Sequence, residues 1–204
     1  MRVLNNECLP IKYGEGFYRH ILYGERYAKL AYFKDVLIGA MSWKIDRASE
    51  HTEEKETERL KKVAEEEERK AKGLEPEEQK EEEKKEPESK ASKRKNKAKK
   101  RGGGGAGAKE KTEEDEADEK MVYMMTITIL NSYRKMGFGK EILKMGEELW
   151  KSEGYKKIVL DVQTSNKEAI EFYKKHGFIQ VREKPKYYTD LDPPDSFFFV
   201  KELA

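Results

Sequence analysis

Apolar and β-branched residues are concentrated in short runs that alternate with polar turns. The first two runs are Tyr27 to Phe33 and Val36 to Ile45, and only Lys34 and Asp35 separate them. Runs of this length and composition, joined by two polar residues, are typical of antiparallel strands with a tight turn. The sequence therefore predicts a β-hairpin here.

Strand and helix patterns alternate in the C-terminal part of the chain. A strand-like run extends from Met121 to Leu130. Beyond it, apolar residues recur at spacings of four, three and four, which is the pattern of one helix face. The predicted buried face of this helix consists of Phe138, Ile142, Met145 and Leu149. A short apolar strand, Lys157 to Val162, comes next.

A second helix is predicted after that strand. It begins with a capping box, in which Ser165 is followed three residues later by Glu168, and it ends at Gly177. Two further strands are predicted at Ile179 to Arg182 and Phe197 to Val200. The resulting order (β, β, insertion, β, α, β, α, β, β) predicts the α/β class, with a mixed central sheet flanked by helices.

A long charged insertion interrupts this single domain. It divides the chain into an N-terminal part (1–48), the low-complexity insertion (49–120) and a C-terminal part (121–204). Charged residues make up 41% of the chain, and their excess lies in the insertion. Acids and bases at helical spacing from Glu53 to Lys72 predict a solvated helix, and the remainder is predicted to be disordered. Closing a loop of about 75 residues rather than about five costs only roughly 2.4 kcal/mol, so the fold tolerates the insertion.

Net charge and cysteine content exclude several classes of protein. The formal net charge is +2, which gives the whole molecule no strong attraction to nucleic acid or to a membrane surface. Cys8 is the single cysteine, so an internal disulfide is excluded and a reducing compartment is favoured. No apolar run is long enough to span a bilayer, and the first residues lack the apolar core of a signal peptide. We therefore expect a protein of the cytoplasm or the nucleus, without membrane contact and without a metal.

The segment YRKMGFGK, Tyr133 to Lys140, lies between a predicted strand and a predicted helix. Its two glycines would allow backbone N–H groups to approach a ligand, and the helix N-terminus adds a positive dipole end. Arg134, Lys135 and Lys140 add cations. Together these features favour a pyrophosphate site. Short glycine turns before helices also occur for structural reasons, so both interpretations stay open on this pattern alone.

Several segments, in order, resemble those of one enzyme family. RKMGFG has the form RxxGxG and is followed by SNxxAIxFYxxxGF, a combination that resembles the acetyl-CoA-binding core of the GNAT acetyltransferases. The chain further resembles the catalytic subunit of NatE-type N-alpha-acetyltransferases through LPIKYGEGFY, KLAYFKDVLIGA, VYMMT, VQTSNKEAIEFYKKHGF and KYYTDLDPPD. The resemblance covers essentially everything outside the insertion. It implies a GNAT fold, acetyl-CoA as co-substrate and acetyl transfer to peptides or nascent chains that begin with Met and an apolar residue.

The resemblance also assigns roles to individual residues. The residues implied to hold acetyl-CoA are Ile127, Arg134, Lys135, Met136, Gly137, Phe138, Gly139, Lys140, Asn166 and Tyr173. Those implied to hold the start of the acceptor peptide are Leu9, Pro10, Ile11, Tyr13, Met125, Tyr187 and Tyr188. Without the resemblance, Asn166 reads only as the start of a helix, and the tyrosines read as core or sheet residues.

Tyr123 and Asp161 match the two catalytic positions of the family. The family has a histidine at the position of Asp161, and an unperturbed aspartate is a weaker base than histidine by about 2.6 pKa units. Because side chains alternate along a strand, Asp161 is expected to face away from its apolar neighbours and into the groove. We hypothesise that it binds the substrate ammonium and passes its proton through water, while Tyr123 acts through water or protonates the leaving thiolate. The competing hypothesis is that catalysis is weakened or lost.

Two alternative functions stay open. One is a GNAT-fold adaptor that binds the NatA complex or the ribosome, and the other is an acetyltransferase for lysine or small amines. The basic run Lys90 to Arg101 is interpreted as a solvated linker, a nuclear-import signal or a contact with ribosomal RNA phosphates. The family normally has another strand and most of a helix before the segment that matches Leu4 to Tyr13, so an exposed sheet edge is expected.

Overall fold

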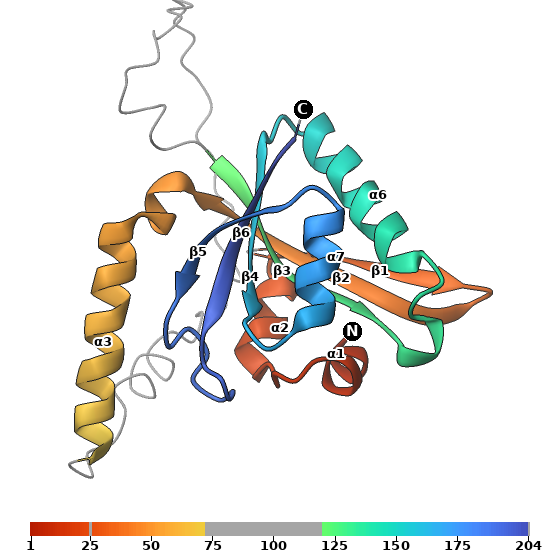
Figure 1. Ribbon diagram of the computed structural model, residues 1–204. Coiled ribbons are helices and arrows are strands. Elements are labelled where there is room, and N and C mark those ends of the chain that lie inside the picture. The colour runs from red at the N-terminus through yellow and green to blue at the C-terminus, as the bar shows by residue number, and fades with distance from the viewer. Residues whose placement is uncertain (25, 72–119, 204) are drawn as a thin grey trace, which may run out of the picture.

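The computed structural model describes residues 1–24, 26–71 and 120–203. Within these ranges the chain forms one six-stranded sheet with helices packed around it (Figure 1). Residues 49–71 of the predicted insertion are among the described residues, and residues 72–119 lie outside them. The predicted basic run, Lys90 to Arg101, therefore also lies outside the described residues.

The sheet is mixed, as the sequence predicts. Its strands are β1 (Tyr27–Phe33), β2 (Val36–Arg47), β3 (Lys120–Ile129), β4 (Lys157–Gln163), β5 (Ile179–Lys184) and β6 (Ser196–Glu202). They lie in the order β1-β2-β3-β4-β6-β5, and all neighbours are antiparallel except β3 and β4. Each strand predicted from the sequence is present, and its bounds differ by only a few residues. The predicted α/β class with a mixed central sheet is confirmed.

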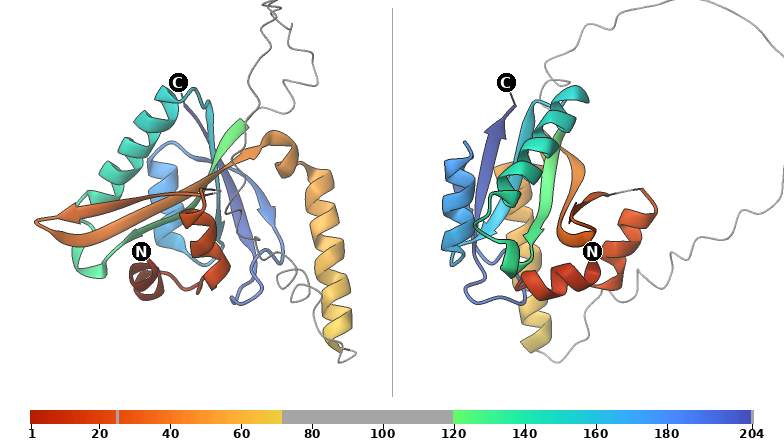
Figure 2. Two further views of the ribbon diagram at one scale, coloured as in Figure 1. Left: turned by 180° about the vertical axis from the view of Figure 1, so that it is seen from behind. Right: turned by 90° about the vertical axis from the view of Figure 1, so that its right-hand side faces the viewer.

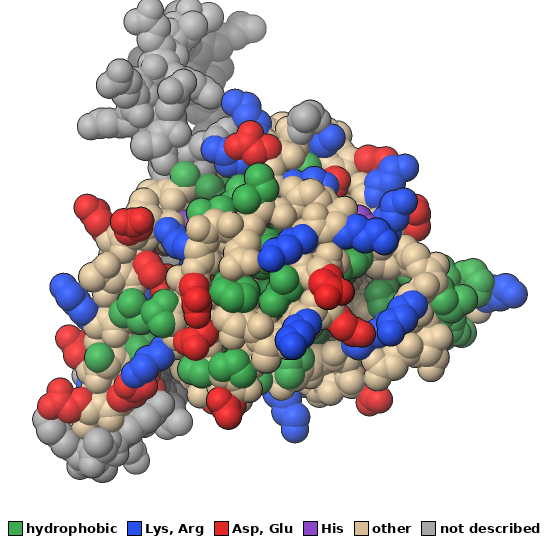
Figure 3. Space-filling view, in the orientation of Figure 1, with side chains coloured by type: hydrophobic (Ala, Val, Ile, Leu, Met, Phe, Trp, Pro, Cys, Tyr) green, Lys and Arg blue, Asp and Glu red, His purple; other side chains and the backbone are tan. Residues whose placement is uncertain are grey.

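The predicted hairpin is confirmed down to its turn. Lys34 and Asp35 connect β1 to β2, with φ values of 47° and 65°. Positive φ at both central residues is the geometry of a type I′ turn, whose twist matches that of the two strands. The hairpin projects from one edge of the sheet, and its end carries exposed apolar side chains, including Tyr32 and Val36 (Figure 3).

The helices cover both faces of the sheet. They are α1 (Arg2–Cys8), α2 (Glu15–Leu22), α3 (Glu53–Ala71), α6 (Phe138–Ser152) and α7 (Lys167–Lys175), with two short 3-10 helices, η1 (Ala48–His51) and η2 (Asn131–Tyr133). Figure 2 shows α6 and α7 on one face and α1 and α2 on the other. Among the described residues, none of the helices combines the length and the apolar character needed to cross a membrane.

Helix α6 buries Ile142 and packs Phe138 and Leu149 against the core, as the spacing predicts, but the prediction is wrong at Met145. Met145 is 68% exposed, and the buried positions are Ile142, Leu143, Gly146 and Trp150. Gly146 takes the buried place that was predicted for Met145, because a glycine does not count as apolar in a periodicity search. A Cβ at Gly146 would lie 2.8 Å from the Cε of Met41, so the glycine allows β2 to pack closely against the helix.

The predicted capping box at the start of α7 is also wrong. The N-cap is Asn166, whose side-chain oxygen accepts a hydrogen bond from the backbone N–H of Ala169 at 3.1 Å. Asparagine is as good an N-cap as serine, so the pattern allowed either start. The predicted end at Gly177 is confirmed, because its φ of 83° suits glycine and ends the helix.

Helix α3 is present where the charge pattern predicts a helix, but it contacts the domain. The Arg59 guanidinium donates hydrogen bonds to the backbone oxygens of Pro185 and Lys186. The Lys186 ammonium in turn pairs with Glu67 at 2.7 Å. The helix therefore lies beside β5 and the loop that follows it (Figure 1), held by charged contacts in place of an apolar face.

The corrected face of α6 can be tested by mutation. Leu143→Ala is expected to lower the free energy of unfolding by about 2 to 5 kcal/mol, because Leu143 is only 1% exposed. Met145→Ala on the same helix is the matched control and should change it by less than about 0.5 kcal/mol. Urea unfolding followed by circular dichroism measures both. A larger loss for Met145→Ala than for Leu143→Ala would restore the face predicted from the spacing.

Candidate active site

The site begins where β3 and β4 separate. These parallel strands are paired at only two positions, Val122 with Ile158 and Tyr123 with Val159. Beyond them, β3 pairs only with β2, and β4 pairs only with β6. Met125 is an extra residue in β3 at this point, because Met124 and Thr126 face consecutive residues of β2. Such a bulge bends a strand and increases its twist, which fits the opening of the sheet here.

A groove of about 1060 Å³ occupies this opening. Its walls come from the diverging strands, the loop before α6, helix α7 and the segment between α1 and α2. Most of the residues predicted from the sequence line it, namely Leu9, Pro10, Ile11, Tyr13, Met125, Ile127, Arg134, Lys135, Gly137, Gly139, Lys140, Asp161, Asn166, Tyr173 and Tyr188. The fold therefore brings together most of the predicted cofactor residues and most of the predicted substrate residues.

Four predicted residues lie outside this groove. Met136 is 61% exposed, and the ring of Phe138 packs against that of Phe33 at a centroid distance of 5.3 Å. Tyr123 and Tyr187 line a second hollow, of about 520 Å³, on the other side of Asp161. Met125 and Asp161 line both the groove and this second hollow, which we call the acceptor-side hollow. The two spaces thus meet at Met125 and at Asp161, one of the two predicted catalytic residues.

The loop before α6 has the geometry of an anion cradle. Lys135 has a φ of 63° and Gly137 a φ of 89°, and the glycine serves as the N-cap of the 15-residue helix. The first backbone N–H groups of a helix have no partner within it, and they point toward an anion at its N-terminus. These features, with Lys140 at the rim, fit the pyrophosphate of a coenzyme A. Arg134 also connects this loop to β3 and α1, because its guanidinium donates to the backbone oxygens of Ile129 and Cys8, both at 3.2 Å.

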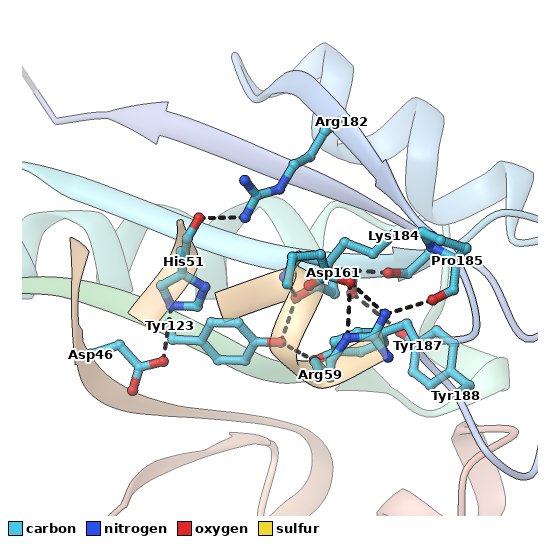
Figure 4. Close-up of polar contacts among 12 residues, drawn as sticks. Asp46, His51, Arg59, Tyr123, Asp161, Arg182, Lys184, Pro185, Tyr187 and Tyr188 are labelled. Carbon is cyan, nitrogen blue, oxygen red and sulfur yellow. Dashed lines mark hydrogen bonds and ion pairs between the residues drawn. The ribbon is translucent and has the colours of Figure 1, made fainter. Parts of the chain in front are cut away.

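Asp161 is a buried ion-pair partner rather than a free carboxylate. Its side chain is 1% exposed, and its Oδ2 accepts hydrogen bonds from Tyr123 at 2.8 Å and from Lys184 at 3.1 Å (Figure 4). Its Oδ1 accepts one from Ser196 at 3.3 Å. The prediction that Asp161 turns away from its apolar neighbours is confirmed by this arrangement, but its charge already has a partner. Lys184 offsets the desolvation cost of burying a carboxylate in an apolar strand.

The tyrosines form a chain of contacts around this carboxylate. The hydroxyl groups of Tyr123 and Tyr187 are 2.6 Å apart, and the rings of Tyr187 and Tyr188 meet edge to face at 4.9 Å. Burial, followed by the nearby Tyr187 and Asp161, raises the pKa of Tyr123 well above its usual value. Burial and Asp161 likewise raise the pKa of Tyr187. Both phenols are therefore protonated at neutral pH and serve as proton donors, not as bases.

Lys184 and His51 are site residues that the sequence did not reveal. The Lys184 side chain is 5% exposed, and its burial lowers its pKa although Asp161 acts in the opposite direction. The His51 ring stacks on that of Tyr123 at 5.5 Å, and its Nε2 lies 3.0 Å from the carboxylate of Asp46. From the sequence, Lys184 next to Pro185 is expected at the surface, and His51 lies within the predicted insertion. Neither position carried a signal that could have identified it.

Comparisons with known proteins agree with this geometry. A family model described as the acetyltransferase (GNAT) family matches residues 59–178. The chain is 24% identical to N-alpha-acetyltransferase 50 of Danio rerio over 204 residues, which covers all of this chain and 81% of that protein. It is 25% identical to the probable N-acetyltransferase san of Drosophila melanogaster over 207 residues, covering all of this chain and 74% of that protein.

A solved structure has the same fold. Arabidopsis thaliana Naa50 in complex with the bisubstrate analogue CoA-Ac-MVNAL superposes with a TM-score of 0.58 at 22% identity, covering 98% of this chain and 88% of that chain. The predicted fold is therefore confirmed. The likeness to N-alpha-acetyltransferases of the NatE type, expected from the sequence, is confirmed as well, at low identity.

The buried ion pair can be tested through stability. Lys184→Met is expected to lower the free energy of unfolding by about 3 to 5 kcal/mol, because it leaves the Asp161 carboxylate buried without a counter-charge. The double variant Asp161→Asn/Lys184→Met removes both charges and should recover most of that loss. Urea unfolding of the wild type and the two variants gives the comparison. A single variant within about 0.5 kcal/mol of wild type would show that the pair is not buried in solution.

Proposed function

The chain belongs to the acetyltransferase (GNAT) family, and from that premise we propose that it transfers acetyl from acetyl-CoA to protein N-termini. The proposed acceptors are peptides or nascent chains that begin with Met followed by an apolar residue. The observation that carries the proposal is the meeting of the groove and the acceptor-side hollow at Met125 and Asp161, with Tyr123 on the hollow side of Asp161. A transferase needs two such spaces, one for each substrate, joined at the reacting atoms.

The groove fits acetyl-CoA in size and in chemistry. Gly137, Gly139 and the first turn of α6 would hold the pyrophosphate, and the backbone of β3 near Ile127, freed from pairing with β4, would hold the pantetheine arm. Asn166 and Tyr173 line the same groove along α7. Bound there, acetyl-CoA supplies an activated acetyl thioester.

The acceptor α-amine needs little help from the protein to lose its proton. An α-amine has a pKa of about 7.7 to 8.0, so its deprotonation at pH 7 costs about 1 kcal/mol, whereas a lysine side chain costs roughly 4.6. A strong base is therefore unnecessary, which suits a site whose carboxylate is already paired with Lys184. We assign Asp161 a positioning role, since its Oδ2 holds the hydroxyl of Tyr123. Tyr123 donates its phenolic proton to the sulfur of the leaving CoA and thus acts as the general acid.

The acceptor's first side chain has an apolar place in the groove. Leu9, Pro10, Ile11, Tyr188 and Leu191 are among the residues that line it. A long unbranched side chain such as methionine adapts well to a pocket of this kind. The analogue bound by Arabidopsis thaliana Naa50 carries the peptide MVNAL, which begins with Met and Val. This supports an apolar second residue for the present chain.

A second candidate function follows from Asp161. Because this position carries an aspartate that is paired within the chain, a GNAT-fold adaptor that binds the NatA complex or the ribosome is the alternative proposal. An acetyltransferase for lysine or small amines is less consistent with the site, since deprotonating a lysine at pH 7 costs roughly 4.6 kcal/mol and the Asp161 carboxylate is already paired with Lys184. Location in the cytoplasm or the nucleus stays a prediction with either function.

Acetyl transfer to a Met-Leu peptide tests the proposed function. Wild-type protein is expected to acetylate the α-amine of that peptide but not a copy whose N-terminus is blocked and which carries an internal lysine. Tyr123→Phe should lower kcat by about a hundredfold, because it removes the proton donor. Tyr32→Phe, on the exposed hairpin, is the matched control and should leave kcat unchanged. If the wild type shows no activity and Asp161→His is active, the proposal of an enzyme is rejected and the adaptor is favoured.

The pH dependence of the reaction follows from the raised pKa of Tyr123. We expect kcat/KM to rise up to about pH 8, where the α-amine of the peptide loses its proton. It should then stay level to at least about pH 10, because a phenol whose pKa is raised keeps its proton throughout that range. Initial rates across this range give the profile. A fall between pH 8 and 10 that persists in Tyr123→Phe would come from another group, such as Lys184, whose pKa is lowered by burial. A fall that is lost in Tyr123→Phe would contradict the raised pKa of Tyr123.

A further inference from the structure

The acceptor-side hollow has an unusual wall. One side is the sheet, with Tyr123 and Met125, and the loop after β5, with Tyr187; the opposite side is helix α3. The α3 residues that line it are Lys55, Glu56, Glu58, Arg59 and Lys62. Helix α3 belongs to the charged insertion that otherwise reads as a solvated spacer. In the structure it borders the space next to the residues where the two substrates would meet (Figure 4).

Contacts of α3 fix its place against residues 185–188 of the loop after β5, which we call the acceptor lip. Arg59 Nη1 donates to the backbone oxygen of Lys186 at 2.8 Å, and the guanidinium lies 5.6 Å from the ring centroid of Tyr187. Glu67, two turns further along, pairs with Lys186 at 2.7 Å. Tyr187 is hydrogen-bonded to Tyr123, so α3 is linked through one side chain to the proposed general acid. The helix is thus a wall of the site rather than a distant appendage.

The lining of this hollow has an excess of positive charge. Seven Lys or Arg and four Asp or Glu line it. Asp161 neutralises Lys184, and Glu56 neutralises Arg59. Glu58 is shared by Lys55 at 3.6 Å and Lys62 at 3.0 Å, so the two ammonium groups have one carboxylate between them.

The sheet side adds further cations. Arg182 donates to a neutral group, the backbone oxygen of His51, and Arg26 lies over the ring of Phe17. Glu50 also lines the hollow and adds one negative charge. Asp46, which is not part of the lining, pairs with Lys44 at 2.8 Å. A net positive lining remains after these pairs are counted. In a partly enclosed space its field favours anionic groups of a ligand.

We propose that the acceptor chain, beyond its second residue, runs through this hollow under α3, and that α3 selects acceptors with acidic side chains there. The inference rests on the proposed function, because it needs an acceptor amine at Tyr123. It adds a preference for the acceptor residues that follow the first two. It also gives the first part of the insertion a task, which is to form one wall of the acceptor site.

Three peptides test the selection, namely Met-Leu-Glu-Glu, Met-Leu-Ala-Ala and Met-Leu-Lys-Lys, each followed by the same neutral sequence. For wild type, kcat/KM should fall in that order, with a ratio of about threefold to tenfold between the first and the last. At an ionic strength of about 1 M, where the Debye length is about 3 Å, the ratio should approach one. Equal values for the three peptides at low salt would overturn the proposal.

Two neighbouring lysines of α3 provide a matched pair of variants. Lys62→Glu reverses a charge that lines the hollow and should bring the ratio to one or invert it. Lys61→Glu makes the same change of net charge on a residue that does not line the hollow, and it should keep the wild-type ratio. Arg59→Ala, which removes the contact with the acceptor lip, should also reduce the ratio. An equal shift for Lys61→Glu and Lys62→Glu would overturn the proposal, because it would show only a net-charge effect.

A second readout separates this inference from the proposed function. The dissociation constants of the three peptides, measured by calorimetry with CoA present, should follow the same order. If no peptide is acetylated, the proposed function fails. In that case, the order of the dissociation constants decides whether α3 still selects acidic chains, and equal constants reject the selection.

Discussion

The separation of β3 and β4 after two paired positions is the constraint on which the site depends. Backbone groups of a strand must find partners, and an interior strand normally takes them from both neighbours. Here β3 loses one neighbour beyond Tyr123, with a bulge at Met125 marking the point of departure. The freed edge is therefore available to a ligand with its own polar chain. Both the groove and the acceptor-side hollow exist because this edge is left open.

Charges at the point of separation are arranged as a closed network. A buried Asp161 needs a counter-charge, and Lys184 supplies it from β5, on the far side of β6, while Tyr123 and Ser196 complete its hydrogen bonds. The same burial keeps the phenols protonated. In such a site the carboxylate is already paired, and the phenols hold their protons tightly. An α-amine acceptor, which loses its proton at little cost, matches those properties better than a lysine side chain does.

Much of the fold and most of the groove could be predicted from the sequence, because both depend on local patterns. The strands follow from runs of branched residues, and the loop at Gly137 follows from its glycines and its place before a helix. The errors have local causes as well. Gly146 is buried without being apolar, and Asn166 caps a helix in place of Ser165.

Residues that act through distant contacts could not be predicted. Lys184 is recognisable only once β5 is known to lie near Asp161, which is 23 residues earlier in the chain. His51 and Arg59 lie in a segment whose composition resembles a spacer, and only the folded chain places them against Tyr123 and Tyr187. Composition reports how much apolar surface a segment can bury, but it does not report single charged contacts.

A crystal structure with a bisubstrate analogue, CoA joined through acetyl to a Met-Leu-Glu-Glu peptide, is the most direct test of the central claim. The account predicts the pyrophosphate at the N-terminus of α6, the acetyl group next to Tyr123 where β3 and β4 part, and the glutamates of the peptide under α3. An analogue bound with its acetyl group away from Tyr123, or not bound in the groove at all, would contradict the account.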